Sequence, residues 1–434
     1  MASMITIGAF AATLIACVAA GVKTIYALMI GYGIFLIYGV SRGFSAAEVV
    51  KMSIKGVLTV KNILIVFVVI GMVTGLWRAA GTIPAIICYA SGVIVPEIFL
   101  PIAFLLNCLV SFMTGTSFGS AATMGVISVT MGIAMGISPV LLGGAMLSGI
   151  MFGDRASPVS SSANLVAELT KTDLYKNIGL MMKSAAVPFV LTVIIYFVLG
   201  QLDGGTGEMM NVTAIFENGF VIHPAAVFPA VLVLILSVFR LGTKRVLAVT
   251  AAVSFVIAVG LQHISPLEAA KIAVFGYHAE NPELAKLIDG GGIVSMMSAV
   301  LIVGLSSSYS GIFDGTGLLD GIKDKIGGLA GKLSPFGATW LVSIFSSMIA
   351  CNQTLATILT HQLCSHLEPD RQKFAIWLEN TAVLMAELIP WSIAGAIPLQ
   401  VVGAPPMGMA FAVYLVLVPA WQVIEQMFAK RNNM

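Results

Sequence analysis

Charge is scarce in this sequence. Only 10% of its 434 residues are Asp, Glu, Lys or Arg, whereas soluble domains carry about 25%. A protein with so few charged side chains cannot expose most of its surface to water. The net charge is only +2, which excludes nucleic-acid binding as a main function, because nucleic-acid-binding domains carry a marked excess of Lys and Arg.

Familiar catalytic and metal-binding motifs are also missing. The five cysteines are scattered and form no CxxC pair, so we interpret them as small apolar fillers within helices. There is no HExxH-type spacing for a metal, no phosphate-binding loop for ATP and no GxSxG nucleophile motif. The sequence therefore predicts neither an enzyme nor a bound cofactor.

Apolar sequence is abundant instead. The chain is 58% hydrophobic with a mean hydropathy of +1.00, and several apolar runs approach the roughly 20 residues that cross a bilayer. Examples are residues 63–76, 185–199, 225–238, 246–261 and 409–423. We predict an all-α, multi-pass protein of the inner or plasma membrane, with about eleven to thirteen membrane segments. The apolar residues 1–40 lack a basic start and are expected to be retained helices.

Fifteen of the 22 basic residues fall into five short regions: Arg42, Lys51, Lys55 and Lys61; Lys171, Lys176 and Lys183; Arg240, Lys244 and Arg245; Lys323, Lys325 and Lys332; Lys430 and Arg431. The positive-inside rule predicts that all five, and hence the C-terminus, are cytoplasmic. Segment 201–221 contains Asp203, Glu208 and Glu217 without Lys or Arg, and segment 262–292 is also rich in acids. Both segments are predicted to be external loops.

The sequence predicts an internal duplication. We divide it into N-terminal helices (1–61), a first repeat (62–200), a spacer with two transmembrane helices (201–292) and a second repeat (293–434). Each repeat has a Gly-interrupted apolar helix, then a small polar break, "SFMTGTSFGSAATMG" or "SSMIACNQTLATILTHQ", then a charged stretch, "FGDRASPVSSSANLVAEL" or "WLENTAVLMAELIPWS". Matching order indicates a repeat, and paired interruptions of apolar segments are typical of the binding site of a secondary transporter.

Three carboxyl groups in the charged stretches are candidates for the site. A charge at mid-bilayer costs roughly 2.5–3.5 kcal/mol, so such residues are usually functional. Asp154 is followed by Arg155, which either orients it or meets an anionic substrate group; alternatively, the pair sits at a helix end near the headgroups. Glu379 and Glu387 are spaced to project from one helix face. Asp314 is expected to be a loop or cap residue.

Neutral polar residues around these carboxyl groups complete the predicted site. They are Thr116, Ser117, Ser157, Ser160, Ser161, Ser162, Asn164, Asn352, Gln353, Asn380 and Thr381. Pro158 prevents a regular helix and frees carbonyl groups, and hard cations such as Na⁺ prefer oxygen ligands. The predicted Na⁺ ligands are Ser160, Ser162, Asn164, Asn380 and Thr381. The alternative is that these small residues serve only helix packing.

Four motifs resemble the NhaC-type Na⁺/H⁺ antiporter family of the ion-transporter superfamily: "TGTSFGSAATMG" (114–125), "SGIMFGDRASPVSSSANL" (148–165), "CNQTLATIL" (351–359) and "LENTAVLMAELIPWSIAG" (378–395). The resemblance covers most of the chain. It implies two inverted repeats, each with a re-entrant hairpin and a broken helix, and a homodimer.

The chain departs from this family at three positions. Family members tend to carry an Asp where this chain has Ser161, Asn352 and Asn380, whereas Asp154 and Glu379 are kept. With fewer acids, we favour Na⁺- or H⁺-coupled transport of a small organic substrate, an amino acid or a carboxylate. Na⁺/H⁺ antiport is the first alternative, and an ion channel, without stoichiometric coupling, is an alternative of another class.

Overall fold

The computed structural model describes residues 2–20, 22, 24–91, 95–203, 212–239, 241–318 and 333–432. Within these ranges the chain is helical, apart from one isolated bridge between Tyr277 and Gly290, so the predicted all-α class is confirmed. Of the residues used to predict topology, Glu208, Arg240, Lys323, Lys325 and Lys332 lie outside the described residues.

The α-helices are α1 (Ala2–Ala19), α2 (Thr24–Ser41), α3 (Ala46–Thr59), α4 (Lys61–Ala79), α5 (Thr82–Ser91), α6 (Phe99–Thr114), α7 (Ser117–Ser120), α8 (Val126–Ala134), α9 (Pro139–Ala156), α10 (Ser161–Thr170), α11 (Leu174–Asp203), α12 (Val212–Gly219), α13 (Pro224–Val238), α14 (Thr243–Gly260), α15 (Pro266–Phe275), α16 (Pro282–Ile288), α17 (Met297–Thr316), α19 (Pro335–Ala350), α20 (Gln353–Cys364), α21 (Arg371–Asn380), α22 (Ala382–Met385), α23 (Ile393–Val402) and α24 (Val413–Asn432).

Seven of the described helices are long and apolar enough to cross a membrane, or up to nine if each of two bent pairs is one span. One bent pair includes Arg371–Leu388 and Ile393–Val402, which meet at 55°. Three shorter apolar helices, Ile5–Leu14, Ile25–Ser41 and Pro335–Ala350, accompany them. A multi-pass membrane protein is therefore shown, while the long spans alone do not reach the predicted eleven to thirteen segments.

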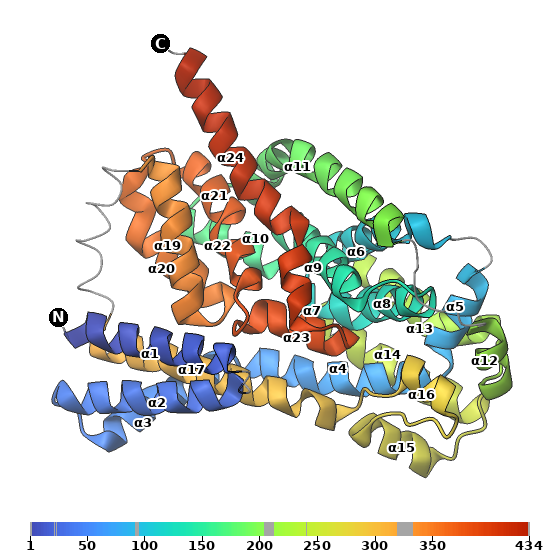
Figure 1. The fold of residues 1–434 in the computed structure, drawn as a ribbon. Helices are drawn as coiled ribbons and strands as arrows, with labels where there is room; N and C mark the ends of the chain where they lie inside the picture. Colours follow the sequence, from blue (N-terminus) through green and yellow to red (C-terminus); the bar gives the residue numbers. More distant parts are fainter. Residues whose placement is uncertain are drawn as a thin grey trace.

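The N-terminal helices form a bundle around α17. Helix α1 packs on α2, and both α2 and α3 pack against α17, as seen at the lower left of Figure 1. Helix α3 begins with a capping box, in which Ser45 and Glu48 satisfy each other's backbone amides. Its buried residues Val49, Ser53 and Gly56 face the bundle, whereas Lys51 and Lys55 are exposed.

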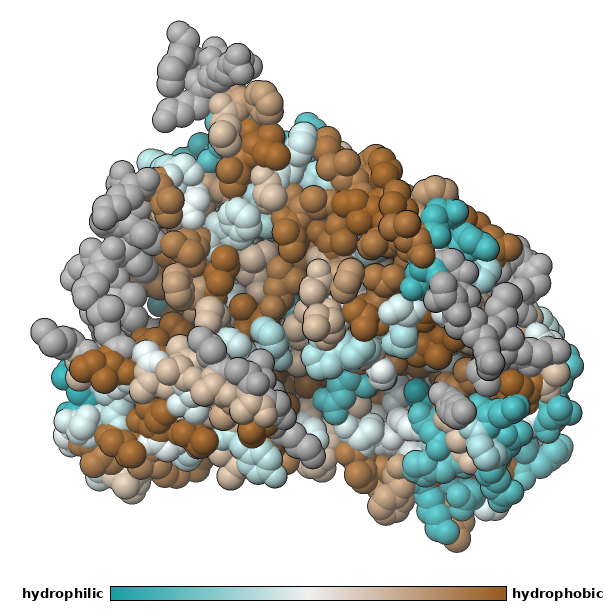
Figure 2. Space-filling view, viewed as in Figure 1, coloured by the Kyte–Doolittle hydropathy of each residue, from teal (hydrophilic) through white to brown (hydrophobic). Residues whose placement is uncertain are grey.

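The two ends of α17 differ in polarity. Basic α3 lies near one end, and the acid-rich residues 262–292, with α15 and α16, lie near the other end (Figure 1). Figure 2 shows a hydrophilic area over α15 and α16 at the lower right and a broad hydrophobic area above it. The two segments that were predicted to lie on opposite sides of the membrane are thus at opposite ends of one span.

Helices α6, α9, α11 and α24 form the core that carries the site (Figure 1). Helix α9 lies directly against α6. The two helices are so close at Gly153 that an added Cβ would lie 2.1 Å from the backbone of Ser111 and Phe112. Small residues allow such close helix approach within membranes. This packing places Asp154 and Arg155, the next two residues of α9, in the interior, where they are 3% and 0% exposed.

Candidate functional site

Two helix hairpins in the two halves of the chain turn in the same way. Helix α6 ends at Gly115 in the left-handed conformation, and extended Thr116 (φ −150°) caps α7. Helix α19 ends at Cys351, also left-handed, and extended Asn352 (φ −151°) caps α20. The caps accept hydrogen bonds from Gly119 and Leu355 amides, respectively, as capping side chains do. Both breaks predicted from the sequence are present.

Each turn contacts a later break in its own half. The Ser157 hydroxyl, in the break between α9 and α10, donates to the Phe112 carbonyl at 2.6 Å. In the second half, Trp391 Nε1, in the break before α23, donates to the Met348 carbonyl at 2.9 Å. Both acceptors lie three residues before the left-handed residue of the hairpin. Each half therefore brings two of its helix breaks together.

Asp154 connects the two halves through a polar cluster. Its Oδ2 lies 3.1 Å from Gln353 Nε2 and 3.0 Å from the Ser162 hydroxyl, and the main chain of Ser117 also hydrogen-bonds this carboxyl group. Ser162 lies 2.8 Å from Gln353 Oε1 as well, and its single proton can serve only one acceptor at a time. Asp154 is thus a buried, hydrogen-bonded acid.

Arg155 makes a second connection between the halves. Its guanidinium donates to the Asn380 carbonyl oxygen, to Tyr414 at 3.0 Å and to Ser184 at 3.2 Å. Asn380 in turn donates to Gln422 at 2.7 Å. No carboxylate of the described residues forms an ion pair with Arg155, although its charge acts on the nearby Glu379. Arg155 therefore holds α9 against α21, α24 and α11.

Glu379 and Glu387 are not on one continuous helix, as the prediction of a shared face assumed. The helix is interrupted at Thr381, whose φ and ψ of −124° and −82° are not helical, so the spacing rule for a continuous helix does not apply. Both carboxyl groups are at most 1% exposed, and none of their oxygens has a hydrogen-bond partner among the described residues. Asp154 acts electrostatically on both of them.

A cavity of about 400 Å³ lies between the two hairpin turns. Ser117 from the first turn and Asn352, Gln353 and Thr354 from the second line it, together with Glu387. Its inner residues are buried, whereas Thr354 and Asp314 at its mouth are exposed. A liquid water occupies about 30 Å³, and ligand pockets measure roughly 300–1,000 Å³. The cavity is therefore large enough for a small organic molecule.

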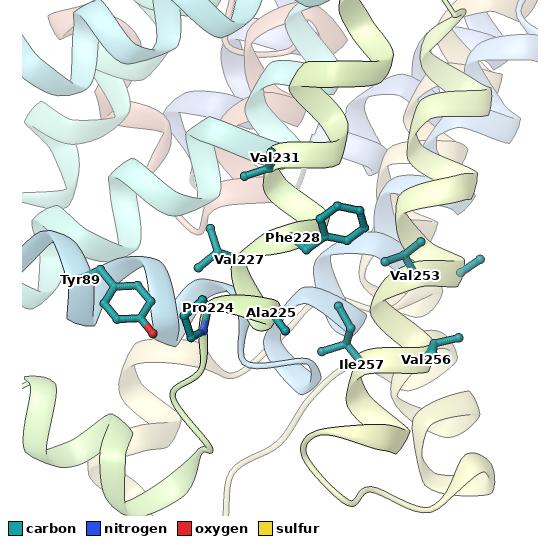
Figure 3. Close-up of a pocket in the computed structure, with 10 residues that line it drawn as sticks. Tyr89, Pro224, Ala225, Val227, Phe228, Val231, Val253, Val256 and Ile257 are labelled. Carbon is teal, nitrogen blue, oxygen red and sulfur yellow. The ribbon is translucent and has the colours of Figure 1, made fainter.

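Two other cavities have different linings. One of about 960 Å³ is an apolar groove formed by α13 and α14, with Tyr89 of α5 at one edge (Figure 3). Phe228, Val253 and Val256 project along it, and it offers almost no polar contact for a solute. Another of about 480 Å³, between α11, α21 and α24, includes Ser184 and Gln422 and so approaches the Arg155 cluster from a different side than the 400 Å³ cavity.

The neutral polar residues that were predicted to bind Na⁺ form hydrogen bonds with several different groups of the protein. Ser160 caps α10 through the amides of Ser162 and Ala163, and Asn164 donates to the Ser160 carbonyl at 2.6 Å. Thr381 donates to Trp377 at 2.7 Å. The Asn380 carbonyl oxygen accepts from Arg155, which occupies an oxygen that a Na⁺ ion would use. Ser161 and Asn164 are exposed.

Sequence reasoning missed several residues of this region. Tyr414 and Gln422 hold the Arg155 cluster, but they lie in a run of apolar sequence that carries no pattern for them. Ser307 and Ser310 line the cavity. A run of serines in the apolar span of α17 is the signal that could have identified these two. Asp314 was expected to be a loop or cap residue, but it lies within α17, and it also lines the cavity.

A multi-pass helical protein with broken helices around buried carboxyl groups has the features of a secondary transporter. The Na⁺/H⁺ antiporter family model matches residues 149–424, and the chain belongs to this family. It is a secondary antiporter of the NhaC family and a transporter, not an enzyme.

Three relatives show the range of the family. The malate-2H⁺/Na⁺-lactate antiporter of Bacillus subtilis is 27% identical over 85% of this chain and 81% of its own. The Na⁺/H⁺ antiporter NhaC of Alkalihalophilus pseudofirmus is 26% identical over 83% and 80%. The arginine/ornithine antiporter ArcD of Halobacterium salinarum is 24% identical over 78% and 72%. These names describe those proteins and include both ion and organic-solute exchange.

Proposed function

We propose that this protein exchanges a small organic substrate for H⁺ or Na⁺ at the 400 Å³ cavity. The cavity carries this proposal, since it is far larger than an ion requires and joins side chains from both helix breaks. Organic substrates are also named for two of the relatives. Asp154 and Ser162 hydrogen-bond to Gln353 of the cavity lining and so link the halves that would move during transport.

We propose that residues 62–200 and 293–434 are two structural repeats. The matching left-handed and extended residues at the two hairpin turns support this, as do the matching bonds from Ser157 and Trp391. In transporters built from repeats, the site lies at their interface, and one repeat moves against the other. The hydrogen bonds of Asp154 to Gln353 and of Arg155 to Asn380 cross this interface.

Glu387 is the group that we assign to coupling. It lines the cavity and is 1% exposed, and neither of its oxygens has a hydrogen-bond partner in the part of the chain that the structure describes. An unpaired charge is costly in such a place, so Glu387 holds either a proton or a cationic ligand. Release of the proton as the ligand binds, and its return as the ligand leaves, gives exchange with a fixed stoichiometry.

Exchange of Na⁺ alone for H⁺ is the second candidate. Among the described residues, neither the Glu379 nor the Glu387 carboxyl group has a hydrogen-bond partner. This supports Na⁺/H⁺ exchange, because either carboxylate can hold a cation.

Proteoliposomes with an internal pH dye separate these functions. A Na⁺ gradient is applied first alone and then with amino acids and carboxylates. We expect little pH change with Na⁺ alone and a saturable change when one organic compound is added. Glu387→Gln should abolish this change, while Glu268→Gln, on exposed α15, should not. A full response to Na⁺ alone would establish Na⁺/H⁺ antiport instead.

A further inference from the structure

The charged side chains that line the cavity are acidic. Among the described residues that line it, two are acidic, Glu387 and Asp314, and none is Lys, Arg or His. Lys55 on α3 acts electrostatically on Asp314, so the charge at the mouth is partly balanced. Arg155 lies outside the lining and is occupied by Asn380, Tyr414 and Ser184. The uncompensated negative group of the cavity is therefore Glu387.

Unsatisfied polar atoms mark the inner end of the cavity. Both carboxylate oxygens of Glu387 and the hydroxyl of Ser307 are buried, and none has a hydrogen-bond partner among the described residues. Buried polar groups are normally satisfied, so three oxygens without partners, on two residues that line the same cavity, indicate a ligand that donates hydrogen bonds. An ammonium group carries three donors and no acceptor, and it pairs strongly with a carboxylate.

An anionic substrate fits this lining poorly. In the proposed exchange Glu387 gives up its proton as the substrate binds, so a bound carboxylate would lie near a second negative charge. No Lys, Arg or His among the described residues of the lining offsets either charge. Like charges at short distance in a low-dielectric interior repel strongly. The amide groups of Asn352 and Gln353 do not change this balance, because Asn352 Nδ2 already donates to the Ala350 carbonyl and Gln353 Nε2 already donates to Asp154 and to the Val383 carbonyl.

We infer that the substrate is an organic cation whose ammonium group binds between Glu387 and Ser307. This rests on the proposed function, and it selects one chemical class among the amino acids and carboxylates considered there. When the ammonium compound binds, Glu387 releases one proton, and when it leaves, Glu387 takes one up. One positive charge thus replaces another at the same carboxylate.

The test compares three labelled compounds in proteoliposomes that are acidic inside. L-lysine carries a side-chain ammonium, L-norleucine is similar in size but lacks it, and L-malate is a dianion. We expect lysine uptake to exceed that of the other two by about tenfold or more, the effect expected from one strong charge-assisted interaction. Uptake should saturate and be accompanied by proton release from the vesicles.

Variants at Glu387 test the assignment to this residue. Glu387→Gln should lose lysine uptake, Glu387→Asp should keep the preference for lysine over malate at a lower rate, and Glu268→Gln should match the unmodified protein. Thermal unfolding of each purified variant shows whether it is folded, and the comparison of lysine with malate on the unmodified protein does not depend on any variant.

Two outcomes would overturn the inference in different ways. Proton-coupled uptake of malate without lysine would leave the proposed function standing and exclude a cationic substrate. Proton movement driven by Na⁺ alone, with no effect of any organic compound, would overturn both. Lysine uptake that is unchanged in a folded Glu387→Gln variant would show that the ammonium group binds elsewhere.

Discussion

Arg155 has an unusual environment for a fully buried cation. It is 0% exposed and bonded mainly to neutral oxygens, with Asn380 as the partner from the other half of the chain. The planar guanidinium can serve several acceptors at once, which a lysine ammonium on a flexible stem does less well. The nearby carboxyl groups of Asp154 and Glu379 offset its charge without direct ion pairing. Arg155 is thus a positioning residue between α9 and α21.

Substitutions of Asn380 test this role. Asn380→Ala removes the acceptor of Arg155 and should lower the free energy of unfolding by about 2 kcal/mol, typical of a hydrogen bond to a charged group. Asn380→Asp keeps an acceptor oxygen there and should be tolerated. Thermal unfolding of the detergent-purified variants measures both. Equal loss of stability in the two variants would show that the Arg155–Asn380 contact is not what holds these helices.

The two hairpin turns differ in one respect, the residue that adopts the left-handed conformation. In the first half it is Gly115, at φ 63°, where a Cβ would lie 2.6 Å from the Val159 backbone. In the second half it is Cys351, at φ 56°. A non-glycine residue in this region costs on the order of 1 kcal/mol, so the same geometry is reached with strain in one half and without it in the other.

Substitutions at the two left-handed positions are expected to change stability in opposite directions. Gly115→Ala should reduce both stability and transport, because the new methyl group displaces the Val159–Ser160 backbone next to Asp154. Cys351→Gly should raise the free energy of unfolding by up to about 1 kcal/mol and leave transport intact. Thermal unfolding and proteoliposome uptake check both variants. Tolerance of Gly115→Ala would mean that the two breaks are not in the tight contact described.

The start of α3 provides a pH-dependent element outside the membrane spans. Glu48 accepts from the Ser45 amide at 2.8 Å and from its hydroxyl at 2.9 Å. These bonds, with Lys51 nearby, hold the pKa of Glu48 below its usual range. A lowered pKa in the folded state means that the stabilisation is present above the ordinary glutamate pKa and is lost as the pH falls through the folded value.

Hydrogen exchange of the first turn of α3 measures this loss. Between about pH 6 and pH 3.5, on either side of the ordinary glutamate pKa, protection should fall in the unmodified protein after correction for intrinsic exchange. Glu48→Gln keeps a capping-box side chain but has no titration, so its corrected protection should stay constant. The same decline in both proteins would exclude Glu48 as the cause.

The positions of the helix breaks could be predicted because their causes are local. Gly115, Pro158 and Pro390 act on the backbone around them, and the polar residues at the turns follow directly in sequence. The break at Thr381 carries no such signal, which is why Glu379 and Glu387 were expected on one face. Tertiary packing, and not a local residue preference, determines the backbone there.

Partners across the molecule could not be predicted. Asp154 and Gln353 are 199 residues apart, and Arg155 and Asn380 are 225 apart. Nothing in one segment specifies the side chain that it meets in the other. The sequence motifs suggested that these four residues lie in one region. That Gln353 contacts Asp154 and Asn380 contacts Arg155 depends on how α9, α20 and α21 pack.

In the whole molecule, the proposed transport site is one cavity between the two halves. The apolar groove at α13 and α14 and the cavity near Trp377 lie elsewhere. The most direct measurement is an electron cryo-microscopy structure with a compound whose uptake has been established in proteoliposomes. The account predicts density for this compound between Asn352 and Glu387. Density in either of the other two cavities, with the 400 Å³ cavity empty, would contradict it.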